Sequence, residues 1–184
     1  LLALADDPQS TRAWNVGAKG EEHLGAILDR AAAKLGWVVL HDRRIPGSRA
    51  NIDHVVVSRL GASVIDAKNY KGDVAKRDVG GWKRADERLF VGGRDCSRLV
   101  QGVLKQREVV EGVLAGSGHP AAPVWGVLCF TEGSWRLFAR PFTLEGAWVT
   151  WPKAALELMS RPPGKGIVEV PLIASRLEAV LRPA

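Results

Sequence analysis

Three charged residues in two neighbouring apolar segments have the types and spacing to do chemistry together. Asp53 lies in the run 52–58, and Asp66 and Lys68 lie in the run 63–68. A charge inside a buried strand is costly unless it is paired or bound to a metal. Two carboxylates can hold a divalent cation between them, and a lysine beside them can position water and offset negative charge. Hydrolysis of a phosphodiester bond requires this combination of groups.

A β-hairpin must position these three side chains. The runs 52–58 and 63–68 are rich in β-branched residues, and residues 59–62 between them predict a turn. Both runs are apolar on both faces, so we expect the hairpin at the centre of its sheet. With an even loop, either 60–61 or 59–62, Asp53 faces Lys68 and Asp66 faces Val55.

This register puts all three charged side chains on one face, with Asp53 diagonal to Asp66 at a Cβ separation below about 7–8 Å. Both carboxylates can then reach one cation, and Mg²⁺ suits such oxygen ligands, with the Ala67 carbonyl as a further ligand. An Asp-Lys pair across two strands can also be an ordinary salt bridge.

A helix over residues 17–35 adds a third acid. Its apolar residues recur with helical spacing, and Glu21 lies three residues before Leu24 and seven before Leu28. Glu21 therefore shares the stripe that faces the core, whereas Glu22 points toward solvent. We expect Glu21 to look onto the sheet beside the hairpin.

The rest of the chain predicts an α/β protein in which a central mixed β-sheet is flanked by helices. The apolar runs 37–40 and 124–130 predict buried strands, and the polar, glycine-rich stretch 71–97 predicts a strand pair with loops. Segments in which apolar residues recur with helical spacing predict the remaining helices. The other expected elements are a helix at 98–114, short strands at 135–139 and 147–151, and terminal helices at 152–160 and 172–181.

Length and composition predict one domain over residues 1–184. The chain has 184 residues and 46% hydrophobic composition, which is enough to bury one core. Lys and Arg number 26 against 20 Asp and Glu, and the net charge of +6 modestly favours polyanionic partners. Cys96 and Cys129 are too isolated for a cysteine zinc site, so we expect a reducing, cytoplasmic setting.

No apolar run approaches the roughly 20 residues that span a bilayer, so we expect no membrane partner for this domain. We recognise no signal peptide before the first helix. The chain begins with Leu rather than Met, which leaves room for a fused or partner domain outside it.

A basic segment follows the hairpin, and its charges have two interpretations. They can line a nucleic-acid groove, with Trp82 as a stacking surface, or they can form a solvated basic hairpin. His54 adjoins Asp53 but should point to the opposite face as a packed histidine. The candidate nucleic-acid-binding residues are Lys71, Lys76, Arg77, Trp82, Lys83 and Arg84.

Three motifs, read in order, resemble one known family. These are GAKGE at residues 17–21, NIDHVVV at 51–57 and VIDAKNYKG at 64–72. Together they resemble the nuclease-related domain (NERD) of the PD-(D/E)XK nuclease superfamily, over about residues 17–130, with strands and helices following at 131–184. The resemblance implies a restriction-endonuclease-like fold and a catalytic role for Glu21, Asp53, Asp66 and Lys68. The family usually has Glu where this chain has Asp66. Gln101 resembles the family's helix glutamine, which implies contact with the active site or with DNA.

The leading hypothesis is hydrolysis of DNA phosphodiester bonds with Mg²⁺ or Mn²⁺, in which Glu21, Asp53 and Asp66 hold the metal. The rival is a nucleic-acid-binding module that keeps the nuclease fold without turnover. A glycoside hydrolase with paired carboxylates is a poor third, because Lys68 would have no task in it.

Overall fold

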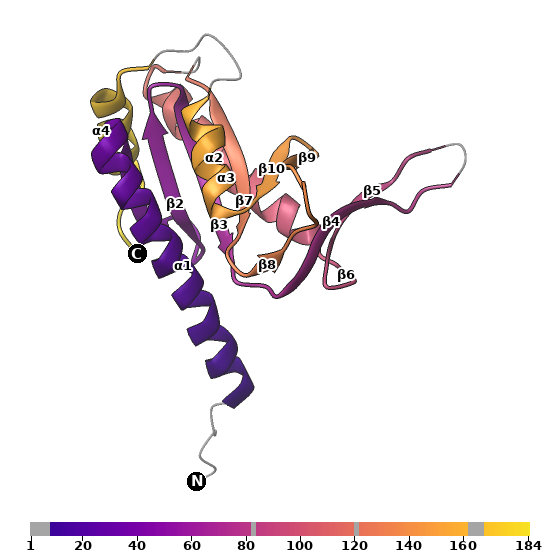
Figure 1. Cartoon of the computed structure of the whole chain (residues 1–184). Coiled ribbons are helices and arrows are strands. Elements are labelled where there is room, and N and C mark those ends of the chain that lie inside the picture. The colour runs from indigo at the N-terminus through magenta and orange to yellow at the C-terminus, as the bar shows by residue number, and fades with distance from the viewer. Residues whose placement is uncertain (1–7, 82–83, 120–121, 162–167) are drawn as a thin grey trace.

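The computed structural model describes residues 8–81, 84–119, 122–161 and 168–184. A helix comes first in this part of the chain, and further helices follow groups of strands (Figure 1). The long helix α1 precedes three strands, and α2 and β7 follow an excursion of short strands. The elements are α1 (Pro8–Leu35), β1 (Val38–Arg44), β2 (Asn51–Ser58), β3 (Gly61–Lys68), β4 (Gly72–Asp78), β5 (Glu87–Val91), β6 (Arg94–Asp95), α2 (Arg98–Gly116), β7 (Val124–Phe130), β8 (Gly133–Ser134), β9 (Phe142–Leu144), β10 (Ala147–Thr150), α3 (Pro152–Ser160) and α4 (Val170–Val180).

A mixed six-stranded sheet forms the centre of the molecule. Its strand order is β1-β2-β3-β7-β10-β9, so the β2–β3 hairpin is internal to the sheet, as its two apolar faces predict. β3 pairs with β7, and β7 with β10, in parallel, whereas the other neighbours are antiparallel. The α/β fold with a mixed central sheet is therefore confirmed.

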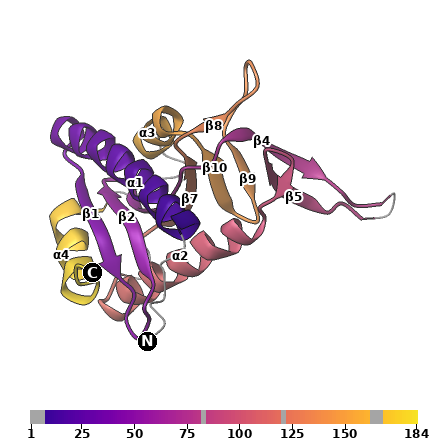
Figure 2. The same ribbon diagram turned by 90° about the horizontal axis from the view of Figure 1, so that it is seen from below.

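Helices cover both faces of the sheet (Figure 2). On one face, Leu24 and Leu28 of α1 pack with Met159 of α3 against Val56 and other strand residues. On the other face, residues of α2 and α4 such as Val103 and Leu177 pack against Val55 and Val57. Successive residues of β2 thus enter opposite cores, which is why residues 55–57 are all apolar.

The excursion between β3 and α2 forms an arm that leaves the body (Figures 1 and 2). β4 and β5 pair in antiparallel fashion from Val74↔Val91 to Asp78↔Glu87, and β6 and β8 complete a second, four-stranded sheet. The strand pair predicted within 71–97 is confirmed. We call residues 72–95 the arm.

The β2–β3 register differs from the prediction by two residues. Ser58 pairs with Gly61 and His54 with Ile65, so the turn contains only Arg59 and Leu60. β3 begins early because its first residue lies against the segment that enters β7: a Cβ on Gly61 would lie 2.2 Å from the Pro123 carbonyl oxygen. Extending the register one step places Asp53 opposite Asp66, not opposite Lys68.

Because the shift is an even number of residues, the expectation that Asp53, Asp66 and Lys68 share a face survives it. Other boundaries also differ from the prediction. α1 begins at Pro8 rather than at residue 17, and β1 runs on to Arg44 instead of ending at residue 40.

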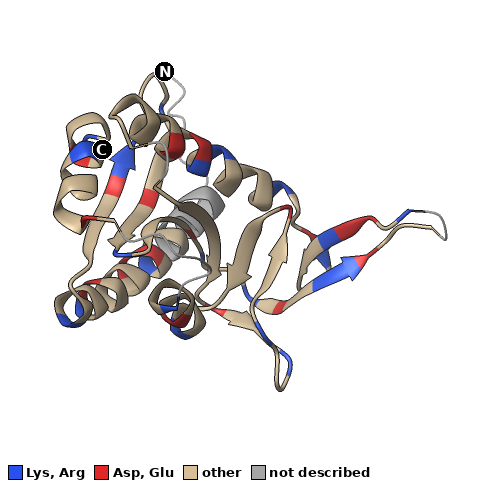
Figure 3. Ribbon diagram, turned by 90° about the horizontal axis from the view of Figure 1, so that it is seen from above, with Lys and Arg blue, Asp and Glu red and all other residues tan. Residues whose placement is uncertain are grey.

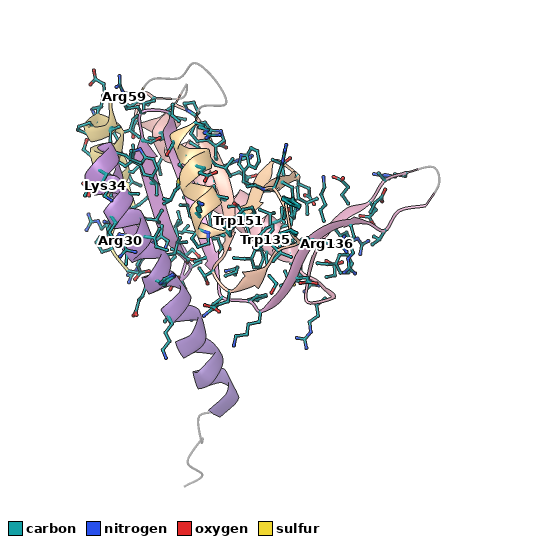
Figure 4. The ribbon with its side chains drawn as sticks, viewed as in Figure 1. Arg30, Lys34, Arg59, Trp135, Arg136 and Trp151 are labelled. Atoms are coloured by element: carbon teal, nitrogen blue, oxygen red, sulfur yellow. The ribbon has the colours of Figure 1, made fainter. Side chains whose placement is uncertain are left out.

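The predicted strand at 135–139 is wrong, because these residues form a loop. Phe138 has φ +63°, a left-handed conformation that no strand accommodates. The Trp135 ring turns inward and packs against Trp151, with ring centroids 4.7 Å apart (Figure 4). The aromatic content that suggested a strand therefore belongs to a packed loop. Among the described residues, no helix is long and apolar enough to cross a membrane.

Candidate active site

Helix α1 crosses closely over the side chains of the residues that follow β3 and β7. Gly20 is buried, and a Cβ there would lie 2.8 Å from the Asn69 Cβ and 3.0 Å from the Thr131 hydroxyl oxygen. Any larger residue would push the helix away from the strand ends. Glu21 follows directly and is half-buried, whereas Glu22 is exposed, as the helical phase predicts.

Four side chains predicted from the sequence meet at this crossing. Lys68 Nζ donates a hydrogen bond to Asp66 Oδ1 at 2.5 Å. Asp53 shares hydrogen bonds with the carboxyl groups of Glu21 and Asp66, and its Oδ2 accepts one from the Ala67 backbone N–H at 2.8 Å. The groups therefore form a row in the order Glu21, Asp53, Asp66, Lys68, which we call the acid row.

The electrostatics of the acid row are those of a site short of positive charge. Burial, followed by the hydrogen bond and negative charge of Glu21, raises the pKa of Asp53 to about 7. Burial also raises the pKa of Asp66 to about 7, although Lys68 opposes the shift. Burial opposes the charge of Lys68 too, but the charge and hydrogen bond of Asp66, together with the charge of Asp53, outweigh it and raise the pKa of the lysine. One cation thus faces three acids, and protons between the carboxyl groups make up the difference.

The chemistry of the acid row fits a hard divalent cation. Magnesium takes oxygen ligands at about 2.0–2.1 Å in an octahedron, so neighbouring ligand oxygens lie about 3 Å apart, as hydrogen-bonded oxygens do. The acids form a row rather than a closed shell, and among the described residues no three His, Cys, Asp or Glu side chains are already grouped as metal ligands. A cation that replaced the shared protons would draw Asp53 and Asp66 together around it. The Ala67 carbonyl stays a predicted ligand.

A chain of polar contacts that the sequence did not reveal ties α1 to the sheet beside the acid row. His54 is buried and its Nδ1 lies 2.9 Å from the Nδ1 of His41. His41 Nε2 lies 2.9 Å from Asp29 Oδ1 on α1. Burial lowers the pKa of His54 to about 4, so this ring is neutral and packed, as expected. These residues line a groove of about 450 Å³ that also contacts Glu21 and Asp53.

Gln101 is not brought to the acid row by any contact of its side chain that the structure describes. It is exposed near the start of α2, where its amide donates a hydrogen bond to Glu145. Its role at the active site or at DNA stays a prediction.

The predicted nucleic-acid-binding residues are dispersed along the arm, and several are already partnered. Lys76 forms an ion pair with Glu87 at 2.8 Å, and the Arg77 guanidinium lies 4.8 Å from the centroid of the Phe90 ring. Acidic and basic residues alternate along the arm (Figure 3). Arg84 is exposed near the arm's tip, and Trp82 and Lys83 lie outside the described residues.

Among the described candidates, Lys71 borders a cavity at the base of the arm. The other residues of that cavity were not singled out from the sequence, although Tyr70 lies within the motif at 64–72 and directly before Lys71. The lining residues are Tyr70, Lys71, Val91, Gly92, Arg94 and Cys96.

Comparison with known families places the acid row inside a recognised sequence domain. The family model described as nuclease-related domain, NERD, matches residues 16–131. The matched region begins just before Glu21 and ends at the Thr131 that contacts α1, so it contains all four residues of the acid row. Neither the comparison with curated proteins nor that with solved structures returned a significant match.

Proposed function

Because this chain belongs to the nuclease-related domain family, we propose that it is a metal-dependent nuclease that hydrolyses DNA phosphodiester bonds. The observation that carries the proposal is the buried acid row, in which Glu21, Asp53 and Asp66 meet beside Lys68. Three convergent acids repel a phosphate backbone, so a site that only bound nucleic acid would gain nothing from them.

In the proposed mechanism Asp53 and Asp66 hold Mg²⁺ or Mn²⁺, with Glu21 and the Ala67 carbonyl completing the protein ligands. When bound, such an ion polarises the phosphate and lowers the pKa of a coordinated water. Asp66 is buried and Asp53 half-buried, which strengthens their attraction for a cation because water screens the charges less.

Lys68 supplies the positive charge that the carboxylates lack. Its ammonium forms an ion pair with Asp66. A phosphate bound beside Asp66 would therefore also lie near Lys68. There the lysine orients the attacking water and offsets the negative charge that develops on the phosphorus oxygens. Because its pKa is raised, the lysine stays protonated at neutral pH.

Glu21 acts at the other end of the acid row. Its hydrogen bond to Asp53 orients that carboxyl group, and its own position is fixed by the close approach at Gly20. Glu21 therefore serves as a metal ligand, directly or through a bound water, and also orients the Asp53 carboxyl group.

The test measures cleavage and binding separately. Linear, circular and single-stranded DNA are incubated with wild type, Asp66→Asn and Lys68→Ala in Mg²⁺, in Mn²⁺ and in EDTA, at one salt concentration. We expect wild type to cut only with metal, and each variant to lose on the order of 100-fold or more in rate. Glu178→Gln on α4, an exposed carboxyl outside the acid row, is the matched control and should cut normally.

Affinity measured in EDTA distinguishes the rival function. Asp66→Asn removes a repulsive charge together with a metal ligand, so metal-free DNA affinity should hold or rise while cleavage collapses. If wild type bound DNA but cut none of the substrates with either metal, and Lys68→Ala only weakened binding, the chain would be a binding module with a nuclease fold.

A further inference from the structure

The cavity at the base of the arm lies where the chain leaves the acid row. Tyr70 and Lys71 follow Lys68 and Asn69 directly, and Val91, Gly92, Arg94 and Cys96 come from β5, β6 and their surroundings. The volume is about 460 Å³, toward the lower end of the roughly 300–1,000 Å³ typical of small-ligand pockets. It has the size to take one small ligand unit.

The walls of this cavity are fixed by backbone contacts. A Cβ on Gly72 would lie 2.6 Å from the Cα of Gly92, so the start of β4 and the β5–β6 turn touch. The Gly92 N–H donates a hydrogen bond to the Asp73 carbonyl at 3.0 Å. Tyr70 leans edge-on against the buried Phe130, with ring centroids 6.2 Å apart, which leaves the ring 43% exposed.

The charges around the cavity differ from those farther along the arm. Lys71 and Arg94 are exposed, and within the described ranges neither forms an ion pair, whereas Lys76 and Arg88 both do. Two unpaired cations beside an exposed aromatic ring match a phosphate and a base. Tyr70 follows Lys68 by two residues at the end of β3, so the cavity begins next to the acid row.

We propose that this cavity binds one unpaired nucleotide next to the phosphate that is cut, with its base stacked on Tyr70 and its phosphate on Lys71 and Arg94. The assignment of the neighbouring phosphate rests on the proposed nuclease function; the nucleotide site itself rests on the cavity. Stacking on an exposed ring requires a free base face, and the cavity holds one nucleotide, so single strands and frayed ends bind here and intact duplex does not.

Cys96 offers a built-in probe of occupancy, because its half-buried thiol lines the cavity while Cys129, the other cysteine, is fully buried. The full chain is treated with N-ethylmaleimide in EDTA, alone or with an oligothymidine of about 12 nucleotides or a blunt duplex of equal length. We expect the oligothymidine to slow modification of Cys96 at least about fivefold and the duplex to leave it unchanged. Cys129 serves as the unreactive internal reference.

Substitutions then separate stacking from charge. Tyr70→Ala and the double variant Lys71→Ala, Arg94→Ala should each weaken oligothymidine binding about tenfold, whereas Tyr70→Phe keeps the ring and should bind like wild type. Arg30→Ala removes an exposed arginine from α1, on the side of the body away from the arm, and should change nothing (Figure 4).

The outcomes keep the two proposals apart. Protection of Cys96 by oligothymidine in a protein that cuts no DNA would support the nucleotide site and reject the nuclease. Metal-dependent cleavage with no protection of Cys96, or with equal protection by duplex, would overturn the site while the nuclease stands. Equal losses in Tyr70→Phe and Tyr70→Ala would also overturn it, because stacking would then not be the interaction.

Discussion

The acid row and the arm both carry acidic and basic side chains on paired strands, yet they treat these charges in opposite ways. Asp53 and Asp66 are buried or half-buried, and their pKa values are raised to about 7. On the arm, backbone hydrogen bonds lower the pKa of Asp78, and a hydrogen bond from Arg88 lowers the pKa of Asp86. One region opposes the charge of its acids, and the other stabilises it.

This difference separates functional charge from structural charge. Exposed ion pairs such as those of Arg88 contribute little to stability, because they are spread along a surface where water already screens the charges. Buried acids with too few cations cost stability, and such costs persist where chemistry needs them. Both regions place acids next to cations, so burial and pairing, rather than the presence of charge, distinguish them.

The largest effect should come from the acid that α1 contributes. Glu21→Ala removes the carboxyl group that contacts Asp53, and cleavage should fall on the order of 100-fold. Glu22→Ala changes the next, exposed residue and should leave the rate within about twofold. Steady-state cleavage of the best DNA substrate measures both. A greater loss in Glu22→Ala than in Glu21→Ala would mean that Glu21 does not belong to the acid row and that Glu22 is the acid of α1 that the site uses.

The dependence of stability on pH should have opposite signs in the two regions. Without metal, Asp53 and Asp66 keep protons up to a pKa of about 7 when folded, against an ordinary pKa of 3.8 for an aspartate. The folded state therefore binds more protons, and the free energy of unfolding should fall as the pH rises from about 4 to about 7, by up to about 1.4 kcal/mol per pH unit for each proton. The lowered pKa values on the arm act the other way, and only as the pH falls below about 4.

Urea unfolding in EDTA at about pH 5 and about pH 8 measures the first effect. Addition of Mg²⁺ should recover the lost stability at the higher pH, because the ion replaces the protons. The double variant Asp53→Asn, Asp66→Asn should show a flatter dependence on pH and no recovery. Stability of the metal-free wild type that rose across this range would contradict the raised pKa values.

The smallest effect should come from the arm. Arg88→Ala breaks exposed ion pairs with Asp86 and Asp95, and because water already screens these charges the midpoint of thermal unfolding should barely change. Cleavage in Mg²⁺ should stay within about twofold of wild type. Thermal unfolding and cleavage assays on the same preparation check both. A loss of cleavage comparable to that of Lys68→Ala would show that charge on the arm is functional after all.

The sequence predicted most of the acid row because its information is local. Helical phase placed Glu21 on the buried side, and the period of two put Asp53, Asp66 and Lys68 on one face for any even loop. Segments with strong boundaries were also predicted well. β7 occupies 124–130 and α3 occupies 152–160, where Pro152 begins the helix.

What the sequence could not provide depends on contacts between distant segments. The hairpin register follows from the approach of Pro123 to Gly61, and the pairing of His41 with Asp29 joins β1 to α1. Likewise, the partnering of Lys76 by Glu87 requires the register of the arm. No periodicity within one segment contains these distances. The sequence therefore left both interpretations of the basic segment open, a nucleic-acid groove and a solvated hairpin.

The mixed pairing of β3 also fixes when the site can assemble. β2 reaches β3 through a two-residue turn, but β7, which flanks its other edge, follows roughly sixty residues later. During synthesis the strand that bears Asp66 and Lys68 therefore waits with one edge unpaired until the arm, α2 and β7 have left the ribosome. Such an edge invites pairing with another chain, so slow or interrupted synthesis after α2 should favour aggregation over folding. We expect closure of this long loop, rather than formation of the hairpin, to limit how fast the acid row assembles.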